Sequence, residues 1–145
     1  MPTLTNLSGT LDTVLSTELN SMANNAIVIS PEITLTNQNY LLAELEFLIS
    51  GMGGAPTANT AFIGWILRAL DGTNYSDGGT SVQPARRPDF IFTVRAVATA
   101  QRLLYRGIYL PPGLMKFLLK NDGTGQALAA SGNTLKVKPY TPQSS

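Results

Sequence analysis

Apolar and polar residues alternate along much of this chain, most regularly between residues 40 and 49. The odd-numbered residues of that segment are all apolar and share one face: Leu41, Ala43, Leu45, Phe47 and Ile49. Glu44 and Glu46 fall on the opposite face. A period of two residues is typical of a β-strand with one buried face. Similar alternation, or a short apolar run, predicts further strands at 26–30, 33–36, 62–70, 90–97, 102–109, 114–120 and 134–138.

Segments rich in Gly, Pro, Asn and Asp separate these strands, notably 51–56, 71–88, 111–113 and 121–123. Seven or eight strands joined in this way indicate an all-β fold, a single β-sandwich that most simply is jelly-roll-like. Before the first strand, five apolar residues recur at helical spacing: Leu11, Val14, Leu15, Leu19 and Met22. They predict a short amphipathic helix, with Thr10 as its cap and Asn24-Asn25 at its end.

The two ends of the chain lack such a period. Residues 1–9 form a polar N-terminal arm and residues 139–145 a polar, Pro-containing tail, so we expect extended termini around one domain at 10–138. The start of the chain does not resemble a signal peptide, because no basic residues precede an apolar run. Every apolar stretch is also too short to predict a membrane span.

Composition narrows the function classes. The chain has 145 residues, of which 43% are hydrophobic and only 13% are charged, and it contains neither Cys nor His. Without them there can be no disulfide framework, no thiolate nucleophile and no Ser-His-Asp triad, and the usual general base and metal ligand are missing. We therefore expect a protein that is not an enzyme, with no catalytic residues, no cofactor and no metal.

Charge is divided unequally along the chain. Residues 1–67 contain five acidic residues and no basic residue, whereas residues 68–145 contain all ten basic residues and four acidic ones. The two parts therefore carry −5 and +6, and the formal net charge is +1. We expect these charges to neutralise each other across a sheet. A net charge of +1 gives no reason to expect a nucleic-acid partner.

Three groups of residues invite a chemical role. Residues 71–77 place oxygen-bearing side chains at alternating positions, as some calcium loops do, but a solvated connection between strands fits better because the full calcium-loop pattern is absent. Glu44 and Glu46 suggest glycosidase chemistry, which needs two carboxylates on opposite sides of a glycosidic bond. Both residues lie on one face of one strand, so they do not meet this requirement. Five aromatic residues could form a sugar-stacking platform, namely Trp65, Tyr75, Tyr105, Tyr109 and Tyr140, although Trp65 lies on an apolar face and is expected in the core.

Two longer stretches are similar to a known family. Residues 70–77 follow the strand that contains Trp65, and the segment 106–113 runs through 114–119 into 124–127 and 130–135. Together, and in this order, these sequence segments resemble virion structural proteins of tailed bacteriophages, of the kind that decorate or cement the capsid. The resemblance extends from about residue 10 to residue 140. It implies a β-rich fold on the capsid surface of the virion, binding to the assembled major capsid protein, and homo-oligomers, either dimers or trimers.

The sequence is compatible with a decorating protein. A particle-bound protein needs no His or Cys, and terminal arms that become ordered on docking would add to its contact with the particle. We expect partner contacts from both termini and from the loop 71–88, where arginines favour a protein interface. The residues are Pro2, Thr3, Leu4, Asn6, Tyr75, Arg86, Arg87, Lys138 and Tyr140. The alternatives are a tail or head-fibre component of the same virion and a carbohydrate-binding module for host-surface glycans.

Overall fold

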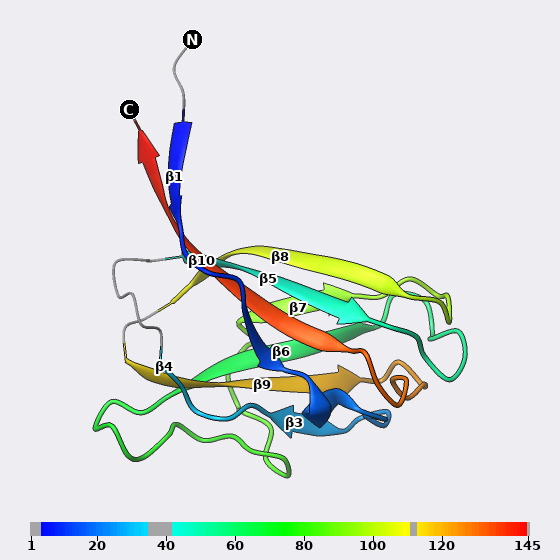
Figure 1. The fold of residues 1–145 in the computed structure, drawn as a ribbon. Coiled ribbons are helices and arrows are strands. Elements are labelled where there is room, and N and C mark those ends of the chain that lie inside the picture. Colours follow the sequence, from blue (N-terminus) through cyan, green and yellow to red (C-terminus); the bar gives the residue numbers. More distant parts are fainter. Residues whose placement is uncertain (1–3, 35–41, 111–112, 145) are drawn as a thin grey trace.

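Strands form where the sequence alternates apolar and polar positions, and they assemble into two antiparallel sheets packed face to face (Figure 1). The computed structural model describes residues 4–34, 42–110 and 113–144. Its strands are β1 (Leu4–Ser8), β2 (Asp12–Leu15), β3 (Ile27–Ile29), β4 (Ile33–Thr34), β5 (Leu42–Ile49), β6 (Ala61–Arg68), β7 (Phe90–Thr93), β8 (Gln101–Tyr109), β9 (Leu114–Asp122) and β10 (Thr134–Ser144). The predicted all-β sandwich is confirmed.

The chain passes repeatedly from one sheet to the other. Sheet A has the order β1-β10-β5-β8, with β2 also paired to β10, and sheet B has the order β3-β9-β6-β7, with β4 also paired to β9. Starting from β2, the chain thus visits sheet A, then B with β3 and β4, A with β5, B with β6 and β7, A with β8, B with β9, and A with β10. This is a jelly-roll-like arrangement.

The main core lies between the sheets, and on β5 it is built by the predicted inward face. Leu45, Phe47 and Ile49 of β5 are fully buried. Phe47 packs edge-on against Phe62 of β6 with ring centroids 5.0 Å apart, and it also contacts Phe92 of β7 at 5.4 Å. Such aromatic contacts join the two sheets and add to the free energy gained from burying apolar surface.

A second, smaller cluster lies on the outer face of sheet B. Trp65 and Leu67 of β6 and Leu118 of β9 form it, and all three are buried. The loop between β6 and β7 covers this face, and the Trp65 indole Nε1 donates a hydrogen bond to the backbone oxygen of Arg86 in that loop at 3.1 Å. Burial of Trp65 is confirmed, but the residue packs under the loop and not between the sheets.

The helix predicted from the spacing of Leu11 to Met22 is wrong. The segment contains β2, whose Thr13 and Leu15 pair with β10, followed by a 3₁₀ turn, η1 (Thr17–Leu19). Val14, Leu15, Leu19 and Met22 are buried all the same. Their spacing of three and four residues arises because a strand end, a 3₁₀ turn and a loop each direct one or two side chains into the core.

The two predicted arms are paired with each other. Leu4–Ser8 and Tyr140–Ser144 form an antiparallel ladder, in which Leu4 lies opposite Ser144 and Ser8 opposite Tyr140. We call this ladder the terminal ribbon, and Figure 1 shows it extending beyond the sandwich at one corner. β10 continues from the sandwich into the ribbon without a break. Predicted positions 1–3, 35–36, 40–41, 111–112 and 145 lie outside the described residues.

Candidate functional site

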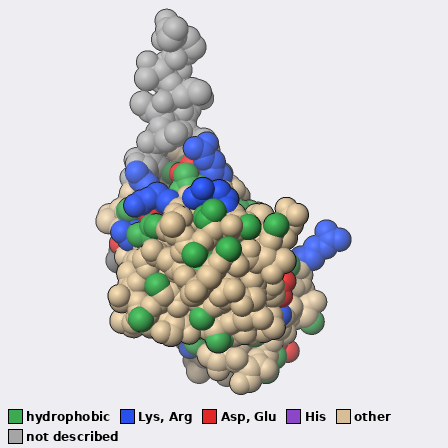
Figure 2. Space-filling view, turned by 90° about the vertical axis from the view of Figure 1, so that its right-hand side faces the viewer, with side chains coloured by type: hydrophobic (Ala, Val, Ile, Leu, Met, Phe, Trp, Pro, Cys, Tyr) green, Lys and Arg blue, Asp and Glu red, His purple; other side chains and the backbone are tan. Residues whose placement is uncertain are grey.

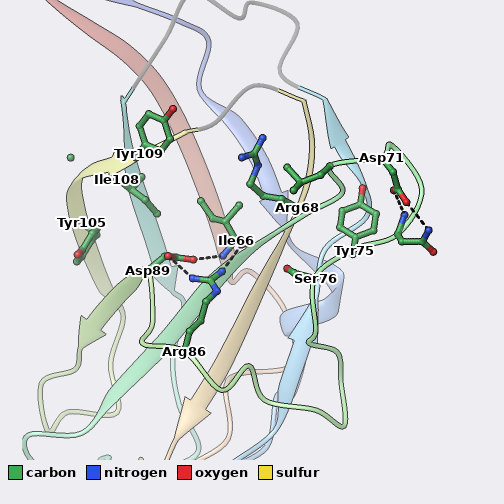
Figure 3. Close-up of a pocket in the computed structure, with 13 residues that line it drawn as sticks. Ile66, Arg68, Asp71, Tyr75, Ser76, Arg86, Asp89, Tyr105, Ile108 and Tyr109 are labelled. Carbon is green, nitrogen blue, oxygen red and sulfur yellow. Dashed lines mark hydrogen bonds and ion pairs between the residues drawn. The ribbon is translucent and has the colours of Figure 1, made fainter.

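A pocket of about 850 Å³ opens between the two sheets on the side where β7 and β8 lie (Figure 3). Ile66 and Arg68 of β6 contribute from sheet B, and β8 contributes residues 105 and 107–109 from sheet A. Residues 70, 71 and 74–76, together with Arg86 and Asp89, come from the loop that joins β6 to β7. Three separate segments of the chain therefore surround one hollow.

The pocket exists because β7 is short. β7 pairs only with Ala61–Gly64, the first half of β6, so on that edge no described strand continues beside the second half, which β9 pairs on its other edge. Side chains take the place of that strand. The backbone N–H of Ile66 donates to Asp89 Oδ2 at 2.7 Å, and Arg86 Nη2 donates to the Ile66 carbonyl oxygen at 2.7 Å. Arg86 Nη1 and Asp89 Oδ1 also form an ion pair at 2.7 Å, so both residues are held in place.

Three tyrosines border the pocket. Tyr105 and Tyr109 lie on one side and Tyr75 on the other, with Arg68 between them (Figure 3). The ring of Tyr105 packs on Phe90 and Phe92, with centroids 6.5 and 6.4 Å away, whereas Tyr109 is 59% exposed. The structure thus brings together three of the five aromatics proposed as a sugar platform. Trp65 lies under the loop and Tyr140 on β10, so neither borders the pocket.

Tyr75 is fixed from two directions. Its hydroxyl donates a hydrogen bond to Glu32 Oε2 at 2.6 Å, and Lys116 Nζ lies 4.5 Å from the centre of its ring. Partial removal from water, together with the hydrogen bond to the Glu32 carboxylate and its negative charge, raises the pKa of Tyr75 to about 12. The phenol therefore stays neutral across the physiological range and presents a rigid ring.

Asp71, the first residue of the calcium-like segment, holds a turn. Its Oδ1 accepts hydrogen bonds from the backbone N–H groups of Thr73 at 2.8 Å and Asn74 at 2.7 Å, and its Oδ2 accepts one from the Asn74 side-chain amide at 2.7 Å. These bonds, the backbone N–H of Asn74 first, lower the pKa of Asp71 to about 2. Within the described residues no cluster of three metal-ligating side chains occurs.

The remaining predicted contact residues lie apart from the pocket. Leu4 and Asn6 are in β1 of the terminal ribbon, Tyr140 is at its base, and the exposed Lys138 precedes it on β10. Arg87 is exposed in the loop next to Arg86. Pro2 and Thr3 lie outside the described residues. Among the described residues of the predicted set, Tyr75 and Arg86 thus border the pocket, four lie in the ribbon or next to it, and Arg87 belongs to neither group.

Sequence reasoning missed Asp89, Ile66 and Ile108 as pocket residues. Asp89 lies directly after Pro88 and directly before β7, three positions after Arg86. This spacing allows an ion pair with Arg86, and it was the one feature of the sequence that indicated Asp89. Nothing in the sequence indicated that β7 would stop early and expose β6. The pocket is a product of tertiary structure.

Glu44 and Glu46 lie on the outer face of sheet A, as predicted, and are paired with arginines. Arg102 Nη1 lies 2.8 Å from Glu46 Oε1, and Arg106 Nε lies 3.6 Å from Glu44 Oε1. On the other side of β5, the strand register sets Lys136 opposite Glu46 and Lys138 opposite Glu44. Two of the five acidic residues in the first part of the chain thus lie beside basic residues of the second part across a sheet.

The end of the sandwich that lies away from the terminal ribbon has an uncharged surface (Figure 1). Its four loops, 20–25, 50–60, 96–100 and 123–133, contain no charged residue. Backbone hydrogen bonds tie them together, among them Met52 N to Ala98 O at 3.0 Å and Leu128 N to Met22 O at 3.0 Å. Figure 2, which looks onto this side, shows mostly neutral and apolar side chains, with Lys and Arg gathered towards the ribbon. We call it the uncharged end.

Comparison with protein-family models, with curated proteins and with solved structures finds no significant match to this chain. No helix in the described ranges has the length and apolar character that crossing a membrane requires.

Proposed function

We propose that this protein is a non-enzymatic structural component of a tailed-phage virion. It decorates or cements the capsid by binding the major capsid protein, and it contacts neighbouring copies of itself in a dimer or trimer on the particle surface. Neither nucleic acid, a membrane nor a cofactor takes part. The resemblance of residues 70–77 and 106–135 to virion proteins supports this proposal.

The observation on which the proposal rests is the terminal ribbon. A decorating protein has to reach beyond its own domain, and here both chain ends do so as one paired element (Figure 1). A pre-ordered ribbon loses less conformational entropy on docking than two separate arms would. A contact made through the ribbon leaves the sandwich undisturbed, so the sandwich serves as a rigid base.

The ribbon also has an open strand edge. Among the described strands, β1 pairs with β10 alone, so no described strand lies along its other edge. Unpaired backbone N–H and C=O groups are a template for adding a strand from another chain. Capsid protein or a second copy would bind there through main-chain hydrogen bonds.

The fold is compatible with this role. Jelly-roll sandwiches recur in viral capsid proteins, and also in lectins and enzymes, so the fold alone is an analogy and does not define function. Glu44 and Glu46 of sheet A are paired with arginines, and the described residues contain no metal cluster. The proposal of a structural role therefore depends on the ribbon more than on the fold.

Co-sedimentation with purified, assembled capsid shells tests the proposal. We expect saturable binding of the intact chain that soluble glycans do not compete away. A variant lacking residues 1–8, which removes β1, should lose most of this binding and keep its melting temperature. The matched control is Ile91→Ser, which removes an apolar side chain that is 46% exposed on β7, away from the ribbon. It should bind as the intact chain does.

Each outcome distinguishes between the alternatives. Full affinity of the truncated variant would show that the ribbon is not the contact. Failure of the intact chain to bind shells, with binding to purified tails instead, would assign the protein to the tail. Failure to bind either would refute the proposed virion role.

A further inference from the structure

The pocket at the β7 side has the size and construction of a ligand site. Its volume of about 850 Å³ falls within the range of about 300 to 1,000 Å³ typical of small-molecule sites. Ile66 and Ile108 are almost fully buried, at 6% and 5% exposure, and provide apolar lining from the two sheets. We propose that this pocket binds a neutral saccharide, a function separate from the proposed docking of the ribbon.

The tyrosines supply the apolar part of such recognition. A sugar ring presents C–H groups on its faces and hydroxyls around its edge, and an aromatic ring offers a flat apolar surface together with a polar tip. Tyr105 is held by Phe90 and Phe92, and Tyr75 by Glu32 and Lys116, so both rings are fixed before a ligand enters. Pre-organised contact residues lose little entropy on binding.

Gly107 makes room between the two tyrosines of β8. Its φ of +74° lies in the left-handed region that favours glycine, and the pairing of β8 with β5 shifts register here, between Ala43 and Leu45. A Cβ at position 107 would meet nothing within 4 Å. The irregularity changes the direction of the strand between Tyr105 and Tyr109, and it leaves space beside both residues in the pocket wall.

The polar groups of the pocket favour a neutral ligand. Two arginines, Arg68 and Arg86, and two aspartates, Asp71 and Asp89, border it, so their formal charges cancel. A pocket for phosphate or for an acidic sugar would need an excess of positive charge. Hydroxyl groups both donate and accept hydrogen bonds, and they are matched by arginine donors next to carboxylate acceptors.

Several of these polar groups are already oriented. Arg86 and Asp89 are fixed by their ion pair and by the backbone of Ile66, and Asp71 is fixed by its turn. Asp71, with its pKa of about 2, accepts hydrogen bonds as a carboxylate at neutral pH. A site whose side chains are held by their own neighbours meets the usual requirement for specific recognition.

Titration calorimetry with four neutral disaccharides, maltose, cellobiose, lactose and N,N′-diacetylchitobiose, each up to about 10 mM, tests the inference and covers dissociation constants in the millimolar range. Sialyllactose is the acidic comparison. We expect at least one neutral probe to bind saturably and more tightly than sialyllactose. Tyr109→Ala should raise the Kd about tenfold or more, which corresponds to about 1.4 kcal/mol. Tyr109 is 59% exposed, so this variant should fold normally.

Leu104→Ala is the matched control, because Leu104 lies on the same strand, is 56% exposed and does not border the pocket. It should bind the probe as the intact chain does. Absence of binding by all four neutral probes, preference for sialyllactose, or an unchanged Kd in Tyr109→Ala would overturn the inference. Protection of Tyr109 by a second copy of the chain, with no sugar bound, would also overturn it and assign the pocket to self-association.

The two proposals fail independently. Tyr109→Ala should leave shell binding intact, and removal of residues 1–8 should leave saccharide binding intact.

Discussion

At the residue scale, Arg86 and Asp89 do for β6 what a neighbouring strand does elsewhere in sheet B. Together they satisfy the backbone N–H and C=O of Ile66, at a point where β7 has already ended. Buried or half-buried backbone groups without partners are costly, so the early end of β7 is tolerated only because these side chains are present. The same two residues contribute charge to the pocket.

Asp89→Ala should therefore lower the free energy of unfolding by about 1–3 kcal/mol, because it leaves the Ile66 N–H without its acceptor and removes the partner of Arg86. Urea unfolding followed by Trp65 fluorescence measures the change. Asp77→Ala, an exposed aspartate in the same loop, is the control and should stay within about 0.5 kcal/mol of the unchanged chain. Equal stability of the two variants would contradict the bridging role of Asp89.

Gly64 is a second residue whose identity is fixed by packing. It lies opposite Phe90 in the β6–β7 register, and a Cβ there would overlap the Phe90 ring and come within 2.9 Å of the Leu118 carbonyl oxygen. Gly64→Ala should lower the free energy of unfolding by about 1–3 kcal/mol through overpacking. Gly79→Ala provides the comparison in thermal melts, because a Cβ there meets nothing within 4 Å. A melting point for Gly64→Ala equal to that of Gly79→Ala would show that sheet B adapts.

Tyr75 should ionise at a higher pH than an ordinary phenol does. Its pKa of about 12 lies above the ordinary value of 10.0, so the folded state holds the phenol proton more tightly than the unfolded state does. The stability that this provides is complete below about pH 10 and is lost as the pH rises through 12. Ultraviolet titration should show a late ionisation that Tyr75→Phe abolishes and that Glu32→Ala shifts towards 10. An unshifted late step in Glu32→Ala would contradict the assigned contact.

At the scale of elements, the terminal ribbon and the sandwich should differ in local stability. A two-stranded ladder with no sheet face beneath it is marginal in water, whereas β5 lies between β10 and β8 and has a fully buried face. Backbone amides of β1 should therefore exchange with solvent orders of magnitude faster than those of β5. Hydrogen exchange followed by mass spectrometry measures this. Equal protection of β1 and β5 would mean that the ribbon is stabilised by contacts between copies.

The strands from β3 to β9 were predictable because their information is local. Alternation of more and less buried residues in β5, or the run of buried residues in β9, requires knowledge of neighbouring residues only. The terminal ribbon was not predictable in this way, because its two strands are far apart in sequence and Pro139 and Pro142 within β10 indicate a tail. The helix predicted at Leu11–Met22 was wrong for a related reason. The core-facing residues there come from a strand end, a 3₁₀ turn and a loop, and their spacing happens to match that of a helix.

The candidate site shows the same division. Tyr75, Tyr105 and Tyr109 could be recognised from the sequence as aromatic residues available for binding. That the three tyrosines border one pocket could not be predicted, because it depends on where β7 ends and on where β8 of the other sheet lies relative to β6. Conversely, the pairing of Glu44 and Glu46 with basic residues followed from charge alone, because acids and bases lie in different parts of the chain and antiparallel strands bring such parts together.

At the scale of the whole molecule, different surfaces are kept apart. Charge is concentrated on the outer face of sheet A and around the pocket, while the four loops of the uncharged end contain none. Those loops are joined by backbone hydrogen bonds, so the uncharged end is a firm surface of small neutral side chains. A particle decorated through the ribbon would have this end available for neighbouring copies or for the solvent.

The continuity of β10 has a mechanical consequence. The strand begins between β2 and β5 and ends as one half of the terminal ribbon, so among the described strands it alone belongs to both parts. A pull that separates the two chain ends would open the ribbon one residue pair at a time, which needs little force. A pull on the whole ribbon away from the sandwich would load β10 along its length and shear all of its cross-strand bonds at once. If the protein is anchored through the ribbon as proposed, a load between the anchor and the sandwich acts in the second way, and the pairing of β10 with β2 and β5 resists it.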